Sequence, residues 1–340
     1  MPQNHQRSWR WTILAAALTI LTNSTTGAGA ETRTVRIAKQ YGISYLPLTI
    51  MEEKKLLEAE GKKRGLDLST EWVKFTGGPP MNEALISGNL DFASGGVGPL
   101  VTIWARTQNN LKVKGVAALN SMPLYLNTIK PEIKSIKDFT DKDRIALPAV
   151  RVSIQAVVLQ MAAEKTFGKG QEHKLDAWTV SLSHPDGLAQ MMSGKSEITA
   201  HLSSAPFQYQ ELADKRVHKV LDSFEVLGGP HTFNIVYATT KLYAENPKLI
   251  KAFVAALGEA MKEIKDDPAA AAALWVKADR SKLPVEEALR IIKLKENRWT
   301  MTPEKTMVFA DYMARVGMVP VKATSWKDMF FDSIHNLPGS

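Results

Sequence analysis

The sequence predicts an α/β protein whose two lobes enclose a cleft. Three observations support this fold class: strand-like and helix-like segments alternate along the chain, one local pattern occurs twice, and no long Gly/Ser/Pro linker separates the halves. A βαβαβα order favours a mainly parallel sheet with helices on its faces. Ligands of open α/β sheets bind outside the carboxyl ends of the strands, so the cleft between two such halves is the expected site.

The repeated pattern is centred on a Ser-Gly pair. The first copy contains Ser87-Gly88 and runs to Pro99, and the second contains Ser193-Gly194 and runs to Pro206. Each copy is typical of a helix end, a glycine stop, an acidic residue, a short strand and a small-residue loop. The proline at its end can open the next helix. Two matches at corresponding places predict two related halves.

The first half contains four predicted strands separated by three predicted helices. Residues 34–39 (TVRIAK) begin with β-branched residues and alternate apolar with polar ones, which indicates a strand. Prolines or glycine-rich turns precede the helices. The remaining elements are expected as a helix at 48–60, a strand at 68–75, a helix ending at Ser87, a strand at 91–94, a helix at 99–108 and a strand at 112–120.

The second half restarts after a short linker element at residues 134–139. Ser153 is the expected N-cap of a helix that runs to about Thr166. The other elements of this half are strands at 144–148, 176–181 and 217–221 and a helix at 184–193. The chain then returns through a strand at 231–239 to helices beginning at Asn246-Pro247, Asp267-Pro268, Pro284 and Pro303, which we expect to pack on the first lobe.

The first thirty residues have the features of a secretory signal peptide. Arg7 and Arg10 precede an apolar run at 12–21 that is too short to span a bilayer comfortably, and Ala28-Gly29-Ala30 offers a cleavage site. We therefore predict cleavage after Ala30 and a periplasmic protein; the alternative is a buried N-terminal helix or an uncleaved anchor. The predicted organisation is a signal peptide at 1–30, a first lobe at 31–122, a second lobe at 123–232, and a return to the first lobe at 233–340.

Composition excludes several classes of chemistry. The sequence contains no cysteine, which excludes disulfides, thiolate metal sites, cysteine nucleophiles and a lipid-anchored cysteine. The formal charge is +8, but the lysines are spread along the chain. Their short clusters at 54–55 and 62–64 indicate a solvated surface rather than a nucleic-acid site. Motifs for a serine hydrolase, a zinc protease and a nucleotide-binding loop are also missing, so we predict no enzyme, no metal and no cofactor.

Six strand-to-helix loops provide the predicted ligand site. Helix N-termini expose backbone N–H groups that attract anions, and small residues let a ligand approach the backbone. Aromatic or polar side chains at the same level are added by Tyr41, Tyr45, His201, His231 and Phe233. The six loops are residues 41–47, 77–80, 94–99, 151–155, 184–187 and 203–206.

Individual candidates keep alternative interpretations. Arg151 suits an oxyanion but is equally typical of a surface residue. His201 follows a strand and is either a cleft residue or a buried core histidine. His184 and His201 are too far apart in sequence for a local metal motif. The glycine pairs Gly77-Gly78 and Gly95-Gly96 either approach a ligand or only make turns.

Several stretches resemble the nitrate/sulfonate/taurine-type substrate-binding proteins of ABC importers, a group similar to thiamine-pyrimidine-binding proteins. They follow one another in order over nearly the whole chain beyond residue 30. The matching stretches are 75–79 (FTGGP) up to Asp91, 135–139 (SIKDF) with 145–148 (IALP), Ser193-Gly194, and 234–238 (NIVYA) followed by 246–253 (NPKLIKAF).

This resemblance implies a type II periplasmic-binding fold with a two-strand hinge near residues 122–127 and 232–237. It further implies a monomer that captures a small anionic solute and hands it to the transmembrane subunits of an ABC permease. By position it assigns the cleft to Tyr41, Gly42, Gly78, Ser94, Gly95, Arg151, Ser153, His201 and Phe233. With the loop analysis, the full predicted ligand-binding set is Tyr41, Gly42, Tyr45, Gly77, Gly78, Ser94, Gly95, Gly96, Arg151, Ser153, Gln155, His201, His231 and Phe233.

Two departures and three rivals accompany this resemblance. The second copy reads Ser-Gly-Lys-Ser-Glu where an Asp-Ala pair is expected, and the small residues at 93–96 leave room for a bulky ligand or a tight anion site. A pyridoxal-phosphate-dependent pyrimidine synthase would need a lysine and works inside cells, against the predicted signal peptide. A desulfinase would need a cysteine. A ligand-sensing module without transport also remains open.

Overall fold

The computed structural model describes residues 34–340, so the predicted signal peptide lies outside the described residues. The described residues form one compact unit. Two sheets belong to what we call the first lobe. In one, β1 and β2 pair in parallel, and in the other the strand order is β3-β10-β4, with β10 antiparallel to both neighbours. These strands are β1 Thr34–Lys39, β2 Ser69–Lys74, β3 Ala93–Gly96, β4 Lys114–Ala118 and β10 Asn234–Ala238.

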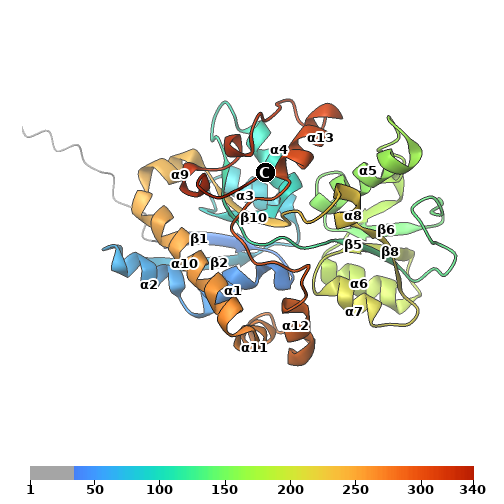
Figure 1. Ribbon diagram of the computed structural model, residues 1–340, viewed down its shortest axis with the longest axis horizontal. Coiled ribbons are helices and arrows are strands. Elements are labelled where there is room, and N and C mark those ends of the chain that lie inside the picture. The colour runs from blue at the N-terminus through green and yellow to red at the C-terminus, as the bar shows by residue number, and fades with distance from the viewer. Residues whose placement is uncertain (1–33) are drawn as a thin grey trace, which may run out of the picture. The chain divides into compact units, whose positions relative to one another are not determined.

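A five-stranded sheet with the order β7-β6-β8-β5-β9 forms the centre of what we call the second lobe (Figure 1). The strand β6 pairs in parallel with β7 and β8, whereas β5 is antiparallel to β8 and β9. The strands are β5 Tyr125–Thr128, β6 Arg144–Leu147, β7 Thr179–Ser181, β8 Ile198–Ser203 and β9 His218–Asp222. The helices beside this sheet are α5 Ile154–Phe167, α6 His184–Ser193, α7 Phe207–Leu212 and α8 Ser223–Leu227, with a 3-10 turn, η2, at Asp176–Trp178.

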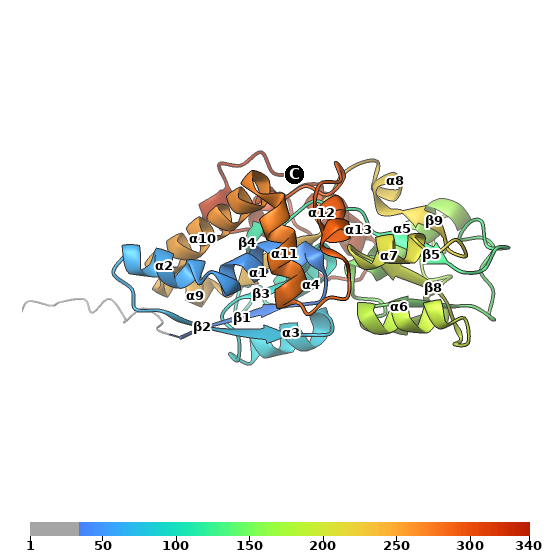
Figure 2. The ribbon, with the colours of Figure 1, turned by 90° about the horizontal axis from the view of Figure 1, so that it is seen from below.

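Helices from both ends of the described chain pack on the first lobe. In Figure 2, α1, α2, α10 and α11 lie beside one another on the side of β1 and β2. Phe253 of α10 stacks on Phe92, the residue before β3, with ring centroids 4.2 Å apart. This contact places α10 against the first lobe, and the predicted return of the whole segment 233–340 to that lobe stays a prediction. The helices are η1 Ile43–Tyr45, α1 Leu46–Glu53, α2 Leu56–Lys63, α3 Gly78–Ile86, α4 Val97–Arg106, α9 Thr240–Glu245, α10 Pro247–Asp266, α11 Pro268–Ala278, α12 Val285–Ile292, α13 Thr306–Arg315, η3 Trp326–Asp328 and η4 Asp332–Ile334.

The chain crosses between the two lobes through the segments that follow β4 and α8. Ser121 in the first crossing and Thr232 in the second form an antiparallel bridge, and Ser121 also bridges Arg298. The expected hinge strands near 122–127 and 232–237 lie in different sheets, because β5 enters the five-stranded sheet and β10 enters the sheet of β3 and β4. The predicted lobe boundaries after residues 122 and 232 stay a prediction.

Both copies of the Ser-Gly pattern end a helix as expected. Gly88 has φ of 77° and Gly194 has φ of 64°, the left-handed conformation that glycine adopts without a steric penalty. Ser153 is the N-cap of α5, and its Oγ accepts a hydrogen bond from the Ala156 N–H. Among residues 34–340, no helix combines the length and apolar character required to cross a membrane.

Four details of the predicted elements are wrong. The strand expected at 176–181 is β7 at Thr179–Ser181 only, because Asp176–Trp178 form the 3-10 turn η2. The helix expected at 48–60 is two helices, because Lys55 takes a left-handed φ of 52° between α1 and α2. The strand expected at 91–94 is β3 at Ala93–Gly96, so Gly95 and Gly96, expected in a loop, pair with β10. The five-stranded sheet is mixed and the β3-β10-β4 sheet is antiparallel, rather than mainly parallel, because β5 and β10 pair antiparallel with their neighbours after the crossings between lobes.

Candidate functional site

A hollow lies where five of the six predicted loops meet, between the two lobes. Its cavity volume is about 30 Å³, room for about one or two water molecules, so an organic solute can enter only if the lobes move apart. The first lobe contributes residues that follow β1, β2 and β3 and those at the start of β10, and the second lobe contributes the N-terminal ends of α5 and α6. The lining residues are Gln40, Tyr41, Tyr45, Thr76, Gly78, Gly96, Pro99, Pro148, Ser153, Ile154, Gln155, His184, Phe233 and Asn234.

Neutral polar groups and rings make up this lining. None of the residues that surround the hollow in the described chain is a lysine, arginine, aspartate or glutamate. Tyr45 is buried, and burial, followed by the proximity of Tyr237, raises the pKa of its phenol well above the usual range. Its hydroxyl accepts a hydrogen bond from Asn234 Nδ2 at 2.9 Å. Asn234 Oδ1 is buried without a hydrogen-bond partner and is therefore available to a donor on a ligand.

One titratable side chain reaches the hollow from the second lobe. His184 opens α6, and its Nε2 lies 3.2 Å from the amide nitrogen of Gln155 on α5. Its Nδ1 lies 3.0 Å from His201 Nε2 on β8, and His201 Nδ1 lies 2.6 Å from Glu211 Oε1 on α7. Phe207 stacks on the His184 ring at 5.4 Å. Burial, followed by the proximity of His201, lowers the pKa of His184 well below its ordinary value.

Seven of the fourteen predicted site residues line the hollow and seven do not. The seven that line it come from both lobes, so the structure brings together residues separated by up to 192 positions, from Tyr41 to Phe233. Those that line it are Tyr41, Tyr45, Gly78, Gly96, Ser153, Gln155 and Phe233; those that lie elsewhere are Gly42, Gly77, Ser94, Gly95, Arg151, His201 and His231.

The glycine-rich segment at 93–96 is filled by protein rather than open to a bulky ligand. A Cβ added at Gly96 would lie 2.5 Å from Ile154 Cγ2, so the second lobe already occupies that space. A Cβ at Gly95 would lie 3.3 Å from the Tyr237 hydroxyl. Ser94 is buried, and its Oγ donates to the Ala38 carbonyl at 2.6 Å. These small residues therefore let strands and lobes approach closely, and the expected room for a ligand is not there.

Two other glycines also serve contacts between the lobes. Gly42 has φ of 118°, and a Cβ added there would lie 2.8 Å from the carbonyl oxygen of Ala205 in the second lobe. A Cβ at Gly77 would lie 3.1 Å from the Pro148 carbonyl oxygen. Both glycines are required for close backbone approach beside the hollow rather than within it.

Arg151 and His231 occupy surroundings unlike the ones expected. The Arg151 side chain is 76% exposed, and its Nε lies 3.9 Å from the Asp176 carboxylate rather than in the hollow. His231 is buried between Phe224 and Phe309, and its ring nitrogens contact the Thr232 carbonyl and the Ser223 hydroxyl, both at 2.8 Å. Burial lowers the pKa of His231 to about 4, so it is a neutral core histidine near neutral pH.

Sequence reasoning missed several residues of the site. His184 opens one of the six predicted loops, so its position gave a signal that could have placed it in the cleft. His201 is the buried core histidine of the alternative interpretation, yet it contacts His184 although 17 positions separate them. Gln40 and Asn234 flank predicted site residues. Glu211 lies inside a short helix, and nothing local marks it as a partner of His201.

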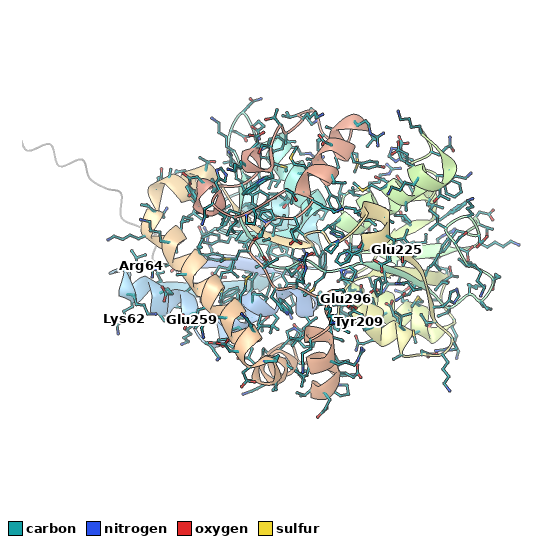
Figure 3. All side chains as sticks on the ribbon, in the orientation of Figure 1. Lys62, Arg64, Tyr209, Glu225, Glu259 and Glu296 are labelled. Atoms are coloured by element: carbon teal, nitrogen blue, oxygen red, sulfur yellow. The ribbon has the colours of Figure 1, made fainter. Side chains whose placement is uncertain are left out.

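Tyr209 and Glu296 lie side by side where α7 meets the segment that follows α12 (Figure 3). The Tyr209 hydroxyl lies 3.4 Å from Glu296 Oε1 and 3.3 Å from Asn297 Oδ1. Burial, followed by the charge of Glu296, raises the pKa of Tyr209 to about 12. A second tie joins α13 to α5, where the Arg315 guanidinium pairs with Glu164 at 2.6 and 2.7 Å. The lobes are thus joined by polar contacts on both sides of the crossings.

Comparisons with known proteins agree with this architecture. A family model described as NMT1/THI5 like matches residues 62–271. The alkanesulfonate-binding protein SsuA from Xanthomonas axonopodis pv. citri, bound to MOPS, is 17% identical with a TM-score of 0.69, covering 86% of this chain and 96% of that chain. The periplasmic nitrate-binding protein NrtA from Synechocystis PCC 6803 is 15% identical with a TM-score of 0.68, covering 90% and 86%.

A Candida albicans protein described as exhibiting the generic periplasmic binding protein structural fold is 14% identical, with a TM-score of 0.66 and coverage of 86% and 92%. No curated protein matches the sequence. At these identities the likeness establishes the fold, and the chain has the periplasmic-binding-protein fold.

Proposed function

The chain belongs to the NMT1/THI5-like family, and on that premise we propose that it is a solute-binding protein that captures a small anionic organic solute between its lobes. The observation that carries this proposal is the hollow lined by strand-end loops of both lobes, whose volume of about 30 Å³ requires the lobes to open before an organic solute can enter. A ligand in such a place contacts both lobes at once and stabilises the arrangement in which they meet. Capture by lobe closure is the physical act that we propose for this protein.

Helix N-termini supply the attraction for an anion. The helices α4, α5 and α6 begin at Val97, Ile154 and His184, all at or beside lining residues. Their first backbone N–H groups and positive dipole ends favour negative charge. The rings of Tyr41, Tyr45 and Phe233 can enclose an organic group. A sulfonate, a carboxylate or nitrate fits this combination, and the sulfonate and nitrate binders among the similar structures support it.

Export and delivery complete the proposal. We place the protein in the periplasm after cleavage at Ala30, as a monomer that delivers its solute to the transmembrane subunits of an ABC permease. The support is the signal-peptide pattern of residues 1–30 and the likeness to periplasmic binding proteins of import systems. N-terminal sequencing of the exported protein tests the cleavage, and a mature chain that retains Trp11 would contradict it.

A planar heteroaromatic solute such as a pyrimidine is the second candidate. The specific observation in its favour is the neutral lining of rings and amides, which suits stacking and hydrogen bonding without a charge. A pyridoxal-phosphate enzyme fits less well, because none of the described lining residues is a lysine that could bind the cofactor. A sensing module would bind the same solute, and only its macromolecular partner would differ.

A thermal-shift screen of the purified protein tests these candidates. The panel contains nitrate, ethanesulfonate, taurine, benzoate and a hydroxymethylpyrimidine. A compound at about a thousand times its Kd adds roughly 4 kcal/mol of stability, which raises Tm by several degrees. Stabilisation by an anion supports the first candidate. Stabilisation by the pyrimidine alone would support the second and contradict the first.

Two variants locate the site. Tyr41→Ala removes a lining ring and should abolish most of the shift, whereas Arg151→Ala removes an exposed side chain outside the lining and should leave the shift unchanged. The unliganded Tm of each variant serves as its own reference. Equal stabilisation of Tyr41→Ala and the wild type would show that the solute binds elsewhere.

A further inference from the structure

A chain of three buried titratable side chains leads away from the hollow into the second lobe. It runs from His184 through His201 to Glu211, and we call these three residues the relay. His184 is 6% exposed, and His201 and Glu211 are fully buried. No group of three or more His, Cys, Asp and Glu side chains within residues 34–340 is arranged to hold a metal ion, so another role must be sought for the relay.

The far end of the relay fixes the direction of its hydrogen bonds. Glu211 Oε2 accepts from Asn127 Nδ2 at 2.7 Å and from the Ser203 hydroxyl at 2.9 Å, and Oε1 lies 2.6 Å from His201 Nδ1. With the carboxylate accepting on both oxygens, His201 Nδ1 carries a hydrogen and donates it. In neutral His201, Nε2 is then the acceptor.

The direction of these hydrogen bonds also determines what the relay presents to the hollow. Because His201 Nε2 accepts, His184 Nδ1 carries the hydrogen between the two rings, which are 3.0 Å apart at these atoms. His184 Nε2 is therefore an acceptor, and it meets the donating amide nitrogen of Gln155 at 3.2 Å. With both imidazoles uncharged, the relay has a net charge of −1 from the Glu211 carboxylate and presents a hydrogen-bond acceptor to the hollow, which is the wrong polarity for an anion.

One added proton reverses this polarity. A proton that binds His184 Nε2 allows the hydrogen on His184 Nδ1 to pass to His201 Nε2. His184 is then neutral again, with Nε2–H as a donor to the hollow, and the positive charge rests on His201 beside the Glu211 carboxylate. The Gln155 amide nitrogen no longer has an acceptor at His184 Nε2, so Gln155 must turn its amide oxygen toward the new Nε2–H or give that place to the anion. The net charge of the relay rises by one.

We propose that the relay takes up one proton when the hollow receives an anion, so that the protein captures the anion together with H⁺. This inference rests on the proposed capture of an anionic solute and names how its charge is balanced. The hollow has no charged side chain in its described lining, and His184 is its titratable link to a buried carboxylate. In the empty site, burial keeps His184 neutral, because it lowers the pKa of that imidazole.

The groups that face His184 from neighbouring elements are consistent with this role. His201 on β8 and Glu211 on α7 are the relay itself, Gln155 on α5 is neutral, and Tyr41 and Tyr45 bring phenols from the first lobe. On its own helix, Asp186 bonds the Ser183 hydroxyl at 2.5 Å. Beyond the lining, Lys74 lies over the Tyr41 ring at 5.1 Å and is paired with Asp279, and Arg151 lies beside Asp176.

The coupling has a defined sign. An anion beside His184 favours the protonated relay, so the bound relay holds its proton to a higher pH than the free relay. Two pH values limit the effect: the one at which the free relay loses its proton and the higher one at which the bound relay loses it. Between them, binding of the anion weakens about tenfold for each unit by which pH rises, because one proton accompanies each anion. Below the lower value and above the higher one, the affinity does not change with pH.

Nitrate and ethanesulfonate are suitable probes, because both are fully ionised between pH 5 and 9 and every proton taken up must reach the protein. A pH-stat records protons consumed per protein on saturation in weakly buffered solution. We expect the wild type to take up about one proton per protein in the window between the two pH values at which the free and the bound relay lose their proton. The His184→Gln variant should take up no proton, and its affinity for the anion should not change with pH. His231→Gln changes a buried histidine outside the relay and should behave as the wild type.

Nitrogen-15 NMR of histidine-labelled wild-type protein gives a readout that needs no variant. At pH 9 we expect His184 and His201 as Nδ1–H tautomers, and on addition of either anion inside the window a hydrogen should appear on His184 Nε2. An Nε2–H tautomer of His184 at pH 9 would overturn the proposal.

The outcomes also separate this inference from the proposed function. An anion that raises Tm without proton uptake would overturn the coupling and leave solute capture intact. If the tautomers at pH 9 are as expected but respond to neither anion, the coupling is also refuted, because the relay is then only a structural hydrogen-bond chain. If in addition neither anion raises Tm, the proposed anion capture is contradicted independently.

Discussion

The two copies of the Ser-Gly pattern share a scaffold and differ in what the scaffold carries. In both, a helix ends at a left-handed glycine, Gly88 or Gly194, and a buried strand follows. The first strand, β3, ends in small residues that bring the lobes together. The second, β8, carries His201 into a buried polar cluster at α6 and α7. A repeat thus predicts the framework, and the chemistry lies where the copies diverge.

The difference follows from what each strand meets. A Cβ at Gly96 of β3 would collide with Ile154, so the first copy has no space for a side chain at this contact. In the second copy the space beside β8 is left by the neighbouring helix, because Gly187 of α6 lies against the His201 ring. The glycine at the close contact lies on the strand in the first copy and on the neighbouring helix in the second. The strand of the second copy therefore has room for a large polar side chain, His201.

Glu211→Ala should produce the largest effect, by removing the buried anchor of the second copy. The change leaves the His201 Nδ1–H, the Asn127 amide and the Ser203 hydroxyl without their acceptor. We expect a loss of about 3–5 kcal/mol in the free energy of unfolding. Urea denaturation followed by circular dichroism measures it.

Glu211→Gln is the matched control for that change. It keeps the shape and one acceptor oxygen, so it should cost less than Glu211→Ala. If both variants unfold at the wild-type urea concentration, the buried cluster does not stabilise the second lobe and the contrast between the copies loses its energetic basis.

Sequence reasoning predicted the framework because its signals are local. The left-handed stops at Gly88 and Gly194 and the Ser153 N-cap depend on neighbours a few residues away, and the structure confirms them. The loops 41–47 and 151–155 reach the hollow because strand ends and helix starts fix the edge of a sheet. Membership of the family and the fold followed from the order of such segments.

The details of the site depend on contacts between distant segments, which a single sequence does not encode locally. Ile154 fills the space beside Gly96 only because the two lobes meet there. Arg151 faces Asp176 and solvent because the turn before α5 directs it outward. The contact between His201 and Glu211 requires α7 to fold back over β8, and no spacing pattern announces that packing.

Gly187→Ala tests the packing difference with a smaller change. An added Cβ would lie 2.8 Å from His201 Nε2, and that ring is held by hydrogen bonds at both nitrogens, so it cannot move away freely. We expect a loss of about 1–3 kcal/mol in unfolding free energy from overpacking. The His184–His201 hydrogen bond should also be disturbed, which the histidine NMR spectrum would report.

Gly258→Ala in α10 is the control for a glycine in a helix without a close neighbour. Its added Cβ would lie 3.8 Å from Met301 Cε, an ordinary contact. We expect a gain of about 0.5–1 kcal/mol, because alanine restricts the unfolded chain and favours the helix. A stabilising Gly187→Ala would show that the His201 ring has room, against the difference drawn between the copies.

The acidic residue after each glycine stop gives the smallest contrast. Asp91 is 11% exposed and accepts from the Arg36 backbone N–H at 2.7 Å and from its Nε at 3.1 Å, whereas Glu197 is 69% exposed and lies 3.9 Å from Arg144 Nε. Asp91→Ala should cost about 1–3 kcal/mol, because a charged acceptor of a backbone donor is lost. Glu197→Ala should cost about 0.5 kcal/mol or less, as exposed ion pairs do. Urea denaturation of both variants measures the two costs, and equal costs would mean that the acid serves the scaffold alike in both copies, so that their divergence begins only at the strand.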